Sequence, residues 1–370
     1  MATANREHHF VPQFYLRYFS TDGKRINLFN FARDKAIFEV SIRHQCSQHK
    51  FYDFAPGLEQ EFSSLEGEAA GVIRNIQSSG ALPKHNSQEW LSLLGFIIFQ
   101  KLRTTSMGYK HDAMTDYLAK LWLENNPEFQ HIDPDGFEMR NIYSVAIPLS
   151  IAGDMIPVAE DLKIHLFVNC TPLEYITSDD PVVVHNQYCE GIDYRGVTGW
   201  NCRGLQVFLP ISPTKLLFLF DPAVYKVGSS HKGKDITSIS NDRDISQLNS
   251  LQILNARNNI YFSGTHSQVT TTKQCGILSS KRPKERMTFV ETEGVDTGNG
   301  ESSSLLHSYE PLLPLKLSVS SISIRKKARK ILLHRRSAMY RRPIDRSEEE
   351  RAAYGRMPSG RYPVKKITRK

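Results

Sequence analysis

Two adjacent histidines near the start of the chain have types and spacing that suggest chemistry. His8 and His9 precede Pro12, and a short apolar run ending at Phe19 follows. Proline favours the first position of a helix, and the free N–H groups and partial positive charge of a helix start attract anions. An imidazole placed there can bind a phosphate or carboxylate, transfer a proton or ligate a metal. Adjacent residues of an extended segment point to opposite sides, so we expect one histidine to serve the site, preferably His9, with His8 as the alternative. The alternative is a structural role, in which the histidine packs against the core and hydrogen-bonds to a carbonyl group.

Gln100 and Arg103 form a second candidate pair, because both project from or beside the apolar side of a predicted helix. A buried arginine needs an anionic partner, since removing its charge from water is costly. The guanidinium fork suits a bound carboxylate or phosphate, although a structural tie between helices fits the same residues. The candidate partners are Glu59, Glu66, Asp179 and Asp180.

Asp179 and Asp180 lie just before Pro181, between two segments with strand-like patterns. Two adjacent carboxylates at the end of a strand can bind Mg²⁺, activate water or pair with the arginine. An Asx turn is the structural alternative for the same sequence. Glu59 and Glu66 are seven residues apart on a predicted helix, about 10 Å, which is too far for both to bind one metal ion.

Together these residues lead us to expect one polar pocket beside the first helix. The candidate catalytic residues are His8, His9, Gln100, Arg103, Asp179 and Asp180. The candidate ligands for a divalent metal such as Mg²⁺ are Asp179, Asp180, His9 and Glu66. Such a set suits metal-assisted hydrolysis of nucleic acid or another phosphoester, with a histidine to move a proton and an arginine to stabilise negative charge.

Two other classes of function fit the same pocket. One is a non-enzymatic sensor or effector module that binds a small anionic ligand. The other is a structural or interaction protein, in which these polar groups only hold the fold together. The paired histidines are also similar to the first motif of His-Asn-His nucleases, but a predicted helix rather than a strand turn follows them and the spacings depart from that pattern.

The composition bounds these interpretations. The chain has 370 residues, of which 40% are hydrophobic and 23% charged, so collagen-like, disulfide-framework and wholly disordered proteins are excluded. No apolar run reaches the roughly 18 residues that a membrane span needs, and residues 1–9 lack the apolar segment of a signal peptide. The scattered cysteines form no Cys-x-x-Cys pair, which argues against a zinc ribbon and favours reduced thiols. We therefore expect a cytoplasmic protein.

The positive charge is concentrated at the C-terminus. Residues 325–370 contain 17 Lys and Arg against 4 Asp and Glu, a net charge of +13, whereas the whole chain carries +8. The remaining residues therefore carry −5 and do not form a general polyanion-binding body. We expect residues 325–370 to contact nucleic acid or an anionic surface, with a solvated extension as the alternative.

Hydrophobic periodicity predicts an α+β fold, with a helical N-terminal half that includes a β-hairpin, then a mostly antiparallel sheet layer and a closing helix. The expected helices cover 12–19, 58–76, one continuous stretch from 86 towards 123, and 242–258. The expected strands are the hairpin 25–31 and 36–42, then 163–169, 174–177, 182–185, 205–209, 216–220 and 261–263.

These elements predict one domain over residues 1–280, with a helical half at about 1–140 and a sheet half at about 141–280. The Ser-, Gly-, Glu- and Pro-rich composition of residues 281–317 predicts a linker. Residues 318–370 are then expected to be a flexible basic tail.

Several motifs together resemble an uncharacterised microbial family, domain of unknown function 4238. They are His8-His9-x-x-Pro-x-x-Tyr-Leu-x-x-Phe, Phe51-Tyr52, Glu59-x-x-Phe-x-x-Leu-Glu66, Phe99-Gln100-x-x-Arg103-Thr104, Thr177 to Val182, Leu209 to Pro213 and the helix with Asn255. The resemblance covers roughly residues 7 to 265. It implies no established activity, but it strengthens the choice of site residues. Some relatives are linked to bacterial antiphage defence, so the resemblance implies such a role as an expectation for this chain.

Overall fold

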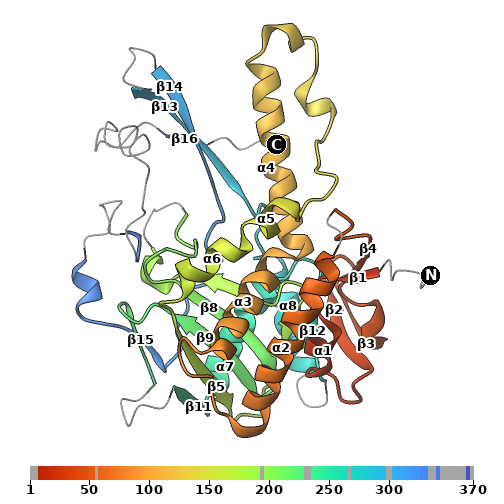
Figure 1. Ribbon diagram of the computed structural model, residues 1–370, viewed down its shortest axis with the longest axis vertical. Helices are drawn as coiled ribbons and strands as arrows, with labels where there is room; N and C mark the ends of the chain where they lie inside the picture. Colours follow the sequence, from red (N-terminus) through yellow and green to blue (C-terminus); the bar gives the residue numbers. More distant parts are fainter. Residues whose placement is uncertain are drawn as a thin grey trace.

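The chain folds around a five-stranded sheet and a four-stranded sheet, with helices packed against them, so the predicted α+β class is confirmed (Figure 1). The computed structural model describes residues 7–54, 57–191, 196–228, 235–264, 268–296, 302–331, 339–341 and 364–366. The α-helices are α1 Gln13–Arg17, α2 Leu58–Ser79, α3 Gln88–Leu102, α4 Thr105–Glu124, α5 Ala146–Ser150, α6 Ala152–Ala159, α7 Asp242–Asn255 and α8 Gln268–Ser279.

The first twelve strands span the region in which sequence patterning predicts the sheets. They are β1 Glu7–His9, β2 Arg25–Asn30, β3 Lys35–Ser41, β4 Ser47–His49, β5 Lys163–Asn169, β6 Thr177–Ser178, β7 Val183–His185, β8 Gln206–Ser212, β9 Lys215–Phe220, β10 Tyr225–Val227, β11 Ile236–Ile239 and β12 Asn259–Phe262. Four more follow, namely β13 Thr288–Asp296, β14 Ser302–Tyr309, β15 Ile322–Ile324 and β16 Val364–Lys366.

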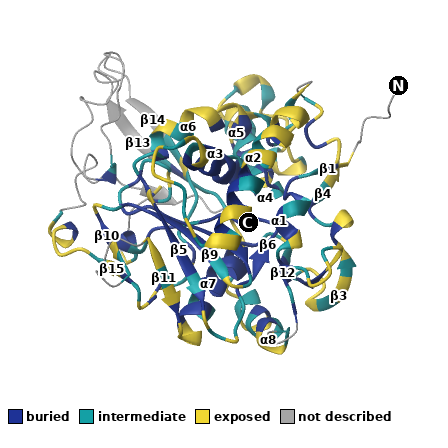
Figure 2. Ribbon diagram, turned by 60° about the horizontal axis from the view of Figure 1, so that its bottom comes forward, coloured by how far each residue is buried: buried dark blue, intermediate teal, exposed yellow. Residues whose placement is uncertain are grey.

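The five-stranded sheet has the order β11-β5-β9-β8-β7 and is antiparallel except for the parallel pair β11 and β5. Both of its faces are buried, so β9 is apolar at successive positions. Leu217 and Leu219 pack in the core shared with α2 and α3, while Phe218 and Phe220 pack in a second core that includes residues of α7. Figure 2 shows α3 and α7 as mostly buried helices beside this sheet.

The four-stranded sheet, β3-β2-β12-β6, is antiparallel throughout and confirms the N-terminal hairpin. Its strand β12 lies between β2 and β6, which come from distant parts of the sequence. The sheet therefore brings the N-terminal region, the Ser178–Pro181 segment and the end of α7 close together.

The prediction of one continuous helix from residue 86 towards 123 is wrong, because the structure has two helices there. Arg103 ends α3 with φ −92° and ψ 7°, and Thr104 is extended at ψ 155°. The Thr104 hydroxyl accepts a hydrogen bond from the Met107 backbone N–H at 3.3 Å and so caps α4. This break lets α4 leave the body of the protein as a projecting arm (Figure 1).

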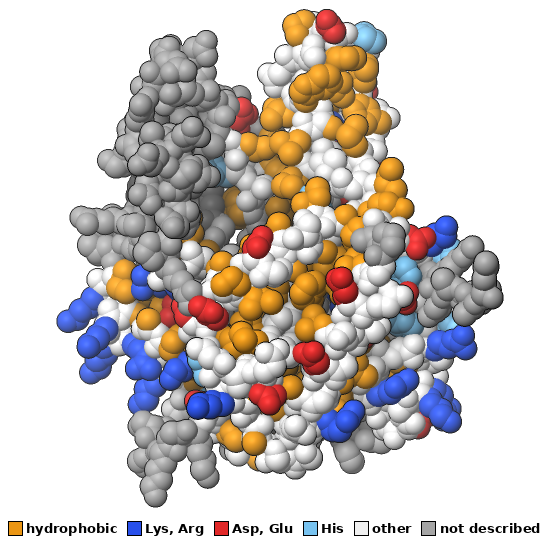
Figure 3. Space-filling view, in the orientation of Figure 1, with side chains coloured by type: hydrophobic (Ala, Val, Ile, Leu, Met, Phe, Trp, Pro, Cys, Tyr) orange, Lys and Arg blue, Asp and Glu red, His pale blue; other side chains and the backbone are white. Residues whose placement is uncertain are grey.

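The arm is apolar on part of its exposed surface. Figure 3 shows hydrophobic side chains gathered over the region of α4 to α6. Trp122, Ile142 and Ile147 are all more than half exposed. Among the described residues, no helix is both long and apolar enough to cross a membrane.

Residues 281–317 are predicted to be a linker and residues 318–370 a flexible tail, but parts of both form strands or pack in a core. Residues 288–296 and 302–309 form the paired strands β13 and β14, and β15 pairs with β10. Leu317, Val319 and Ile322 are buried in the second core. The apolar residues are too widely spaced among polar ones for the pattern to reveal this packing. Most of the basic stretch, residues 332–338, 342–363 and 367–370, lies outside the described residues.

Candidate functional site

A cavity of about 340 Å³ lies at the N-terminal histidines. β1, α1 and α2 border it, together with two side chains from the segments after β4 and α3. Its lining consists of Glu7, His8, His9, Pro12, Gln13, Phe14, Arg17, Tyr52, Glu59, Phe62, Ser63, Glu66 and Arg103. Both histidines border this cavity, so the expectation that only one faces it does not hold. The cavity is bounded by α1 as well as α2, which lets it take in side chains from both sides of the short strand β1.

His8 is held by the segment that follows β4. Its Nδ1 accepts a hydrogen bond of 2.9 Å from the Tyr52 backbone N–H, and its ring stacks on the Tyr52 ring with centroids 5.5 Å apart. A nitrogen that accepts from an N–H carries no proton, so the proton of this imidazole is on Nε2. Nε2 lies 3.6 Å from Oε2 of Glu59, slightly beyond hydrogen-bond distance, so this N–H makes no hydrogen bond among the described residues.

His9 is held by its other nitrogen. Its Nε2 lies 3.1 Å from the backbone carbonyl of Arg43, which can only accept, so this nitrogen carries the proton. The amide nitrogen of Gln13 lies 3.2 Å from the same nitrogen. Both atoms are donors in this tautomer, so the hydrogen bond of Nε2 goes to the Arg43 carbonyl. Nδ1 has no hydrogen-bond partner among the described residues and keeps its lone pair. Burial is the main cause that lowers the pKa of His9 below 6.5, so the ring carries one proton and no charge at neutral pH.

Arg103 is buried and its guanidinium is fixed by two side chains. Its Nη1 donates to Oε1 of Glu66 at 2.6 Å, and its Nε and Nη2 donate to Oε1 of Gln100 at 3.1 and 2.7 Å. Gln100 in turn donates to the backbone carbonyl of Phe10 at 2.9 Å. Of the five N–H groups of an arginine, two remain for a ligand. This chain of contacts joins α2 and α3 to the strand that carries the histidines.

The cavity therefore presents both hydrogen-bond donors and an acceptor. His8 offers an N–H, Arg103 offers its remaining N–H groups, and His9 offers a lone pair. The charge of Glu66 is compensated by Arg103, while the carboxylates of Glu7 and Glu59 also line the cavity. Such a set can hold an anionic or polar oxygen and take a proton from an attacking water.

Asp179 and Asp180 are not among the residues that line this cavity. The carboxylate of Asp179 accepts the backbone N–H groups of Arg257, Asn258 and Asn259 at 2.8, 2.7 and 3.2 Å. Burial is the main cause that raises its pKa, and these hydrogen bonds oppose that effect. Asp179 therefore holds the connection between α7 and β12.

Asp180 is fully buried and faces a lysine that sequence analysis did not single out. Its Oδ2 lies 3.5 Å from Nζ of Lys101, while its backbone carbonyl accepts from the Asn255 side chain at 2.6 Å. Close by, Lys110 forms an ion pair of 2.6 Å with Glu310 from the segment after β14. The six predicted residues thus divide into two groups, with Gln100, Arg103 and the histidines in one and the two aspartates in the other.

The residues present do not fit a bound divalent metal. Within the described residues, no group of three or more His, Cys, Asp or Glu side chains could hold a metal ion. The proton on Nε2 of His8 prevents that nitrogen from ligating a cation. Of the four predicted ligands, only His9 and Glu66 border the cavity, and a catalytic metal site needs about three protein ligands.

The contribution of Tyr52 was missed because it acts through its backbone. Its backbone N–H determines which nitrogen of His8 carries the proton, and the pattern of side chains in the sequence gives no sign of such a backbone contact. Lys101 was missed because a lysine on an apolar helix is ordinarily interpreted as reaching for solvent. The adjacent positions of Gln100 and Lys101 on α3 were a usable signal, since two long polar residues there require partners on different sides of the helix.

Comparison with known proteins gives one family. The model of DUF4238, described as a protein of unknown function, matches residues 7–266. No curated protein and no solved structure matches the chain. The matched region contains both histidines, Arg103 and the two aspartates, and it covers well over half of the sequence. The chain therefore belongs to the DUF4238 family.

Proposed function

We propose that the cavity at the N-terminal histidines is the active site of a hydrolase that acts on a phosphoester by general acid–base catalysis. The observation that supports this most directly is that both histidines border one cavity and that each has one ring nitrogen without a hydrogen bond in the described part of the chain. This nitrogen is Nε2 in His8 and Nδ1 in His9. Among the described residues, the Nε2–H of His8 makes no hydrogen bond and has only the Glu59 carboxylate nearby, at 3.6 Å, and Nδ1 of His9 is unprotonated and has no donor.

In this mechanism His9 takes the proton of the attacking water through Nδ1 while the water oxygen forms a new bond to phosphorus. The ester P–O bond breaks, and the released alkoxide takes a proton from solvent, to which His9 later returns its own. Arg103 and the N–H of His8 bind the phosphoryl oxygens, where negative charge increases during attack. The Glu66 and Gln100 side chains keep the guanidinium in one orientation, so Gln100 is a positioning residue. Because the donor set lacks the ligands for a metal, no step depends on one.

The experiment uses the full chain with bis-p-nitrophenyl phosphate and with single-stranded and double-stranded nucleic acids, with and without EDTA. We expect hydrolysis that persists in EDTA. The variant His9→Ala should lower kcat about 10² to 10⁴-fold, the usual size of a general-base contribution. Circular dichroism should show that the variant remains folded.

His44→Ala is the matched control, because His44 is exposed close by in the sequence and does not line the cavity. It should leave the rate unchanged. Loss of all activity in EDTA, or equal effects of the two substitutions, would contradict the proposal. A rise in melting temperature with a phosphorylated ligand but without turnover would instead favour the non-enzymatic binding module.

A further inference from the structure

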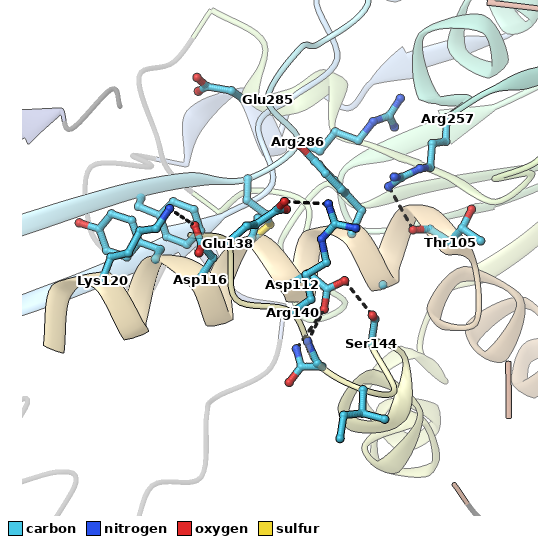
Figure 4. A pocket seen from close by; sticks show the side chains of 18 of the residues that line it. Thr105, Asp112, Asp116, Lys120, Glu138, Arg140, Ser144, Arg257, Glu285 and Arg286 are labelled. Carbon is cyan, nitrogen blue, oxygen red and sulfur yellow. Dashed lines mark hydrogen bonds and ion pairs between the residues drawn. The ribbon is translucent and has the colours of Figure 1, made fainter. Parts of the chain in front are cut away.

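A second and larger cavity, of about 700 Å³, lies between α4 and the segment that leads into β13 (Figure 4). One face of α4 forms a wall of it, since the lining residues Thr105, Tyr109, Asp112, Asp116 and Lys120 recur every three or four positions. Residues 285–289 and Arg257 also line it. None of these residues borders the cavity at the histidines.

Three arginines without ion pairs gather at one end of this cavity. Among the described residues, Arg257, Arg282 and Arg286 form no salt bridge with a carboxylate, and Arg257 and Arg286 line the cavity. Arg286 is close enough to both of the others to repel them. After burial, the charge of Arg286 is the next cause that lowers the pKa of Arg257, and it also helps to lower the pKa of Arg282 to about 10.

Part of this charge has a structural use. Arg286 donates to the backbone carbonyls of Asn255 and Ala256, and Arg282 donates to those of Ala256 and Arg257. These contacts cap the end of α7, but a helix end carries only about half a negative charge. Asp179 is the carboxylate beside the group, and it already accepts three backbone N–H groups. The three guanidinium groups therefore share one nearby carboxylate.

Asp112, Asp116, Glu138 and Glu285 also line the cavity, but none of them forms an ion pair with Arg257 or Arg286. Asp112 accepts from Asn141 and Ser144, and Asp116 pairs with Lys120 at 2.8 Å. Figure 4 shows Asp116 and Lys120 at one end of the cavity and Arg257 at the other, where it donates to the Thr105 carbonyl. The Thr105 hydroxyl at this end is buried and has no hydrogen-bond partner.

Aromatic side chains border the same space. The guanidinium of Arg257 lies 4.4 Å from the centroid of the Tyr109 ring, which is 42% exposed. The Phe289 ring stacks on Tyr117 with centroids 4.4 Å apart. The cavity thus combines unpaired guanidinium groups at one end with apolar surface along its length, and its volume lies in the range of small-molecule sites.

We propose that this cavity binds a phosphorylated small molecule with a planar or apolar part, such as a nucleotide. The phosphate groups lie between Arg257 and Arg286, because guanidinium groups bind phosphate oxygens with paired, charge-assisted hydrogen bonds. The planar part lies along α4 towards Tyr109. This site is separate from the proposed active site and does not depend on it.

Isothermal titration calorimetry of the full chain with ADP, pyrophosphate and adenosine tests this site. We expect ADP to bind more tightly than pyrophosphate, and adenosine to bind far more weakly than either. Ala113→Glu places a carboxylate on the α4 wall without touching the arginines or their contacts with α7. It should weaken ADP binding at least about tenfold, because a like charge is brought near the phosphates.

Leu118→Glu is the matched control, because it makes the same charge change at an exposed position of α4 outside the cavity. It should leave ADP binding unchanged, and so should His9→Ala. If Ala113→Glu fails to fold, Arg257→Gln replaces it, with the same expected loss. Equal binding of adenosine and ADP, equal effects of the two glutamate variants, or no binding of ADP and pyrophosphate at millimolar concentration would overturn the proposal.

Discussion

The cavity at the histidines and the turn with the two aspartates contain similar polar residues but use them differently. At the cavity, His8, His9 and Arg103 each make the contacts that fix their orientation and keep one or two groups free. At the turn, both oxygens of Asp179 accept backbone N–H groups, and Asp180 is enclosed against Lys101. The difference shows that residue type alone does not identify a site. What matters is whether hydrogen-bonding capacity remains that faces open space.

The largest expected effect on stability comes from Lys101→Met, which leaves Asp180 as an unpaired buried charge. Breaking a buried pair in this way costs about 3–5 kcal/mol of unfolding free energy. Denaturation in urea, followed by circular dichroism, measures the loss.

The double variant Lys101→Met with Asp180→Leu removes both charges and is the control for this pair. It should recover most of the lost stability, because an apolar pair of similar volume is about as stable as a buried ion pair. A stable Lys101→Met variant with lost phosphoester hydrolysis would instead place Asp180 in the active site.

Asp179→Ala is expected to cost about 2–3 kcal/mol, because it leaves three backbone N–H groups of the α7–β12 connection without their acceptor. The same urea titration applies. His9→Ala provides the comparison, since His9 is only half-buried and should cost less than about 1 kcal/mol. Equal losses from the two variants would remove the distinction between the turn and the cavity.

The ion pair of Lys110 and Glu310 should make the protein sensitive to acid. Burial acts to raise the pKa of Glu310, but the charges of Lys110 and Lys101 and the hydrogen bond from Lys110 together outweigh it and lower this pKa to about 2. Because the pKa of this carboxyl is lower in the folded state, its stabilising effect is present above pH 4.5 and is lost as the pH falls towards 2. Glu310→Gln should lower stability at pH 7 by about 2 kcal/mol.

The measurement for this ion pair is urea denaturation at several pH values between 7 and 2.5. The Glu310→Gln variant should lose less stability over the acid part of this range than the original chain does. Parallel curves would show that the carboxyl has the same pKa in the folded and unfolded states.

The smallest effect is a shift in the pH profile of the proposed hydrolysis. Since the general base acts only when unprotonated, the rate should fall in acid. The pKa of His9 is lowered by burial, so the acid midpoint of kcat/KM should lie below pH 6.5. A midpoint above pH 6.5 would show that another group limits the rate.

Helices and strands with regular apolar spacing could be predicted from the sequence, because one buried face dictates the period. The stripe from Leu58 to Ile76 became α2, and the alternating segments from Arg25 to Ser41 became the hairpin. Of the site, the residue types and the importance of the N-terminal histidines were accessible, but not that both border one cavity. The break at Thr104 was not, since a threonine fits a helix interior and a helix cap equally well.

The division of the six candidate residues into two groups could not be predicted. It depends on which long-range partners they meet, such as the Tyr52 N–H for His8 and the Arg257 N–H for Asp179. Backbone N–H groups are present at nearly every position, so their placement follows from the fold alone. The packing of the C-terminal segment against the second core depends in the same way on contacts between distant residues.

Nitrogen-15 NMR of the imidazole rings tests the central claim most directly, with His8→Gln and His9→Gln variants to assign the signals. At pH 7 we predict that both rings carry a single proton on Nε2. Nδ1 of His8 should be hydrogen-bonded and insensitive to added phosphate, and Nδ1 of His9 should be free and respond to it. A proton on Nδ1 of His8, or two protons on His9 at this pH, would contradict the arrangement of one donor and one acceptor on which the proposed catalysis depends.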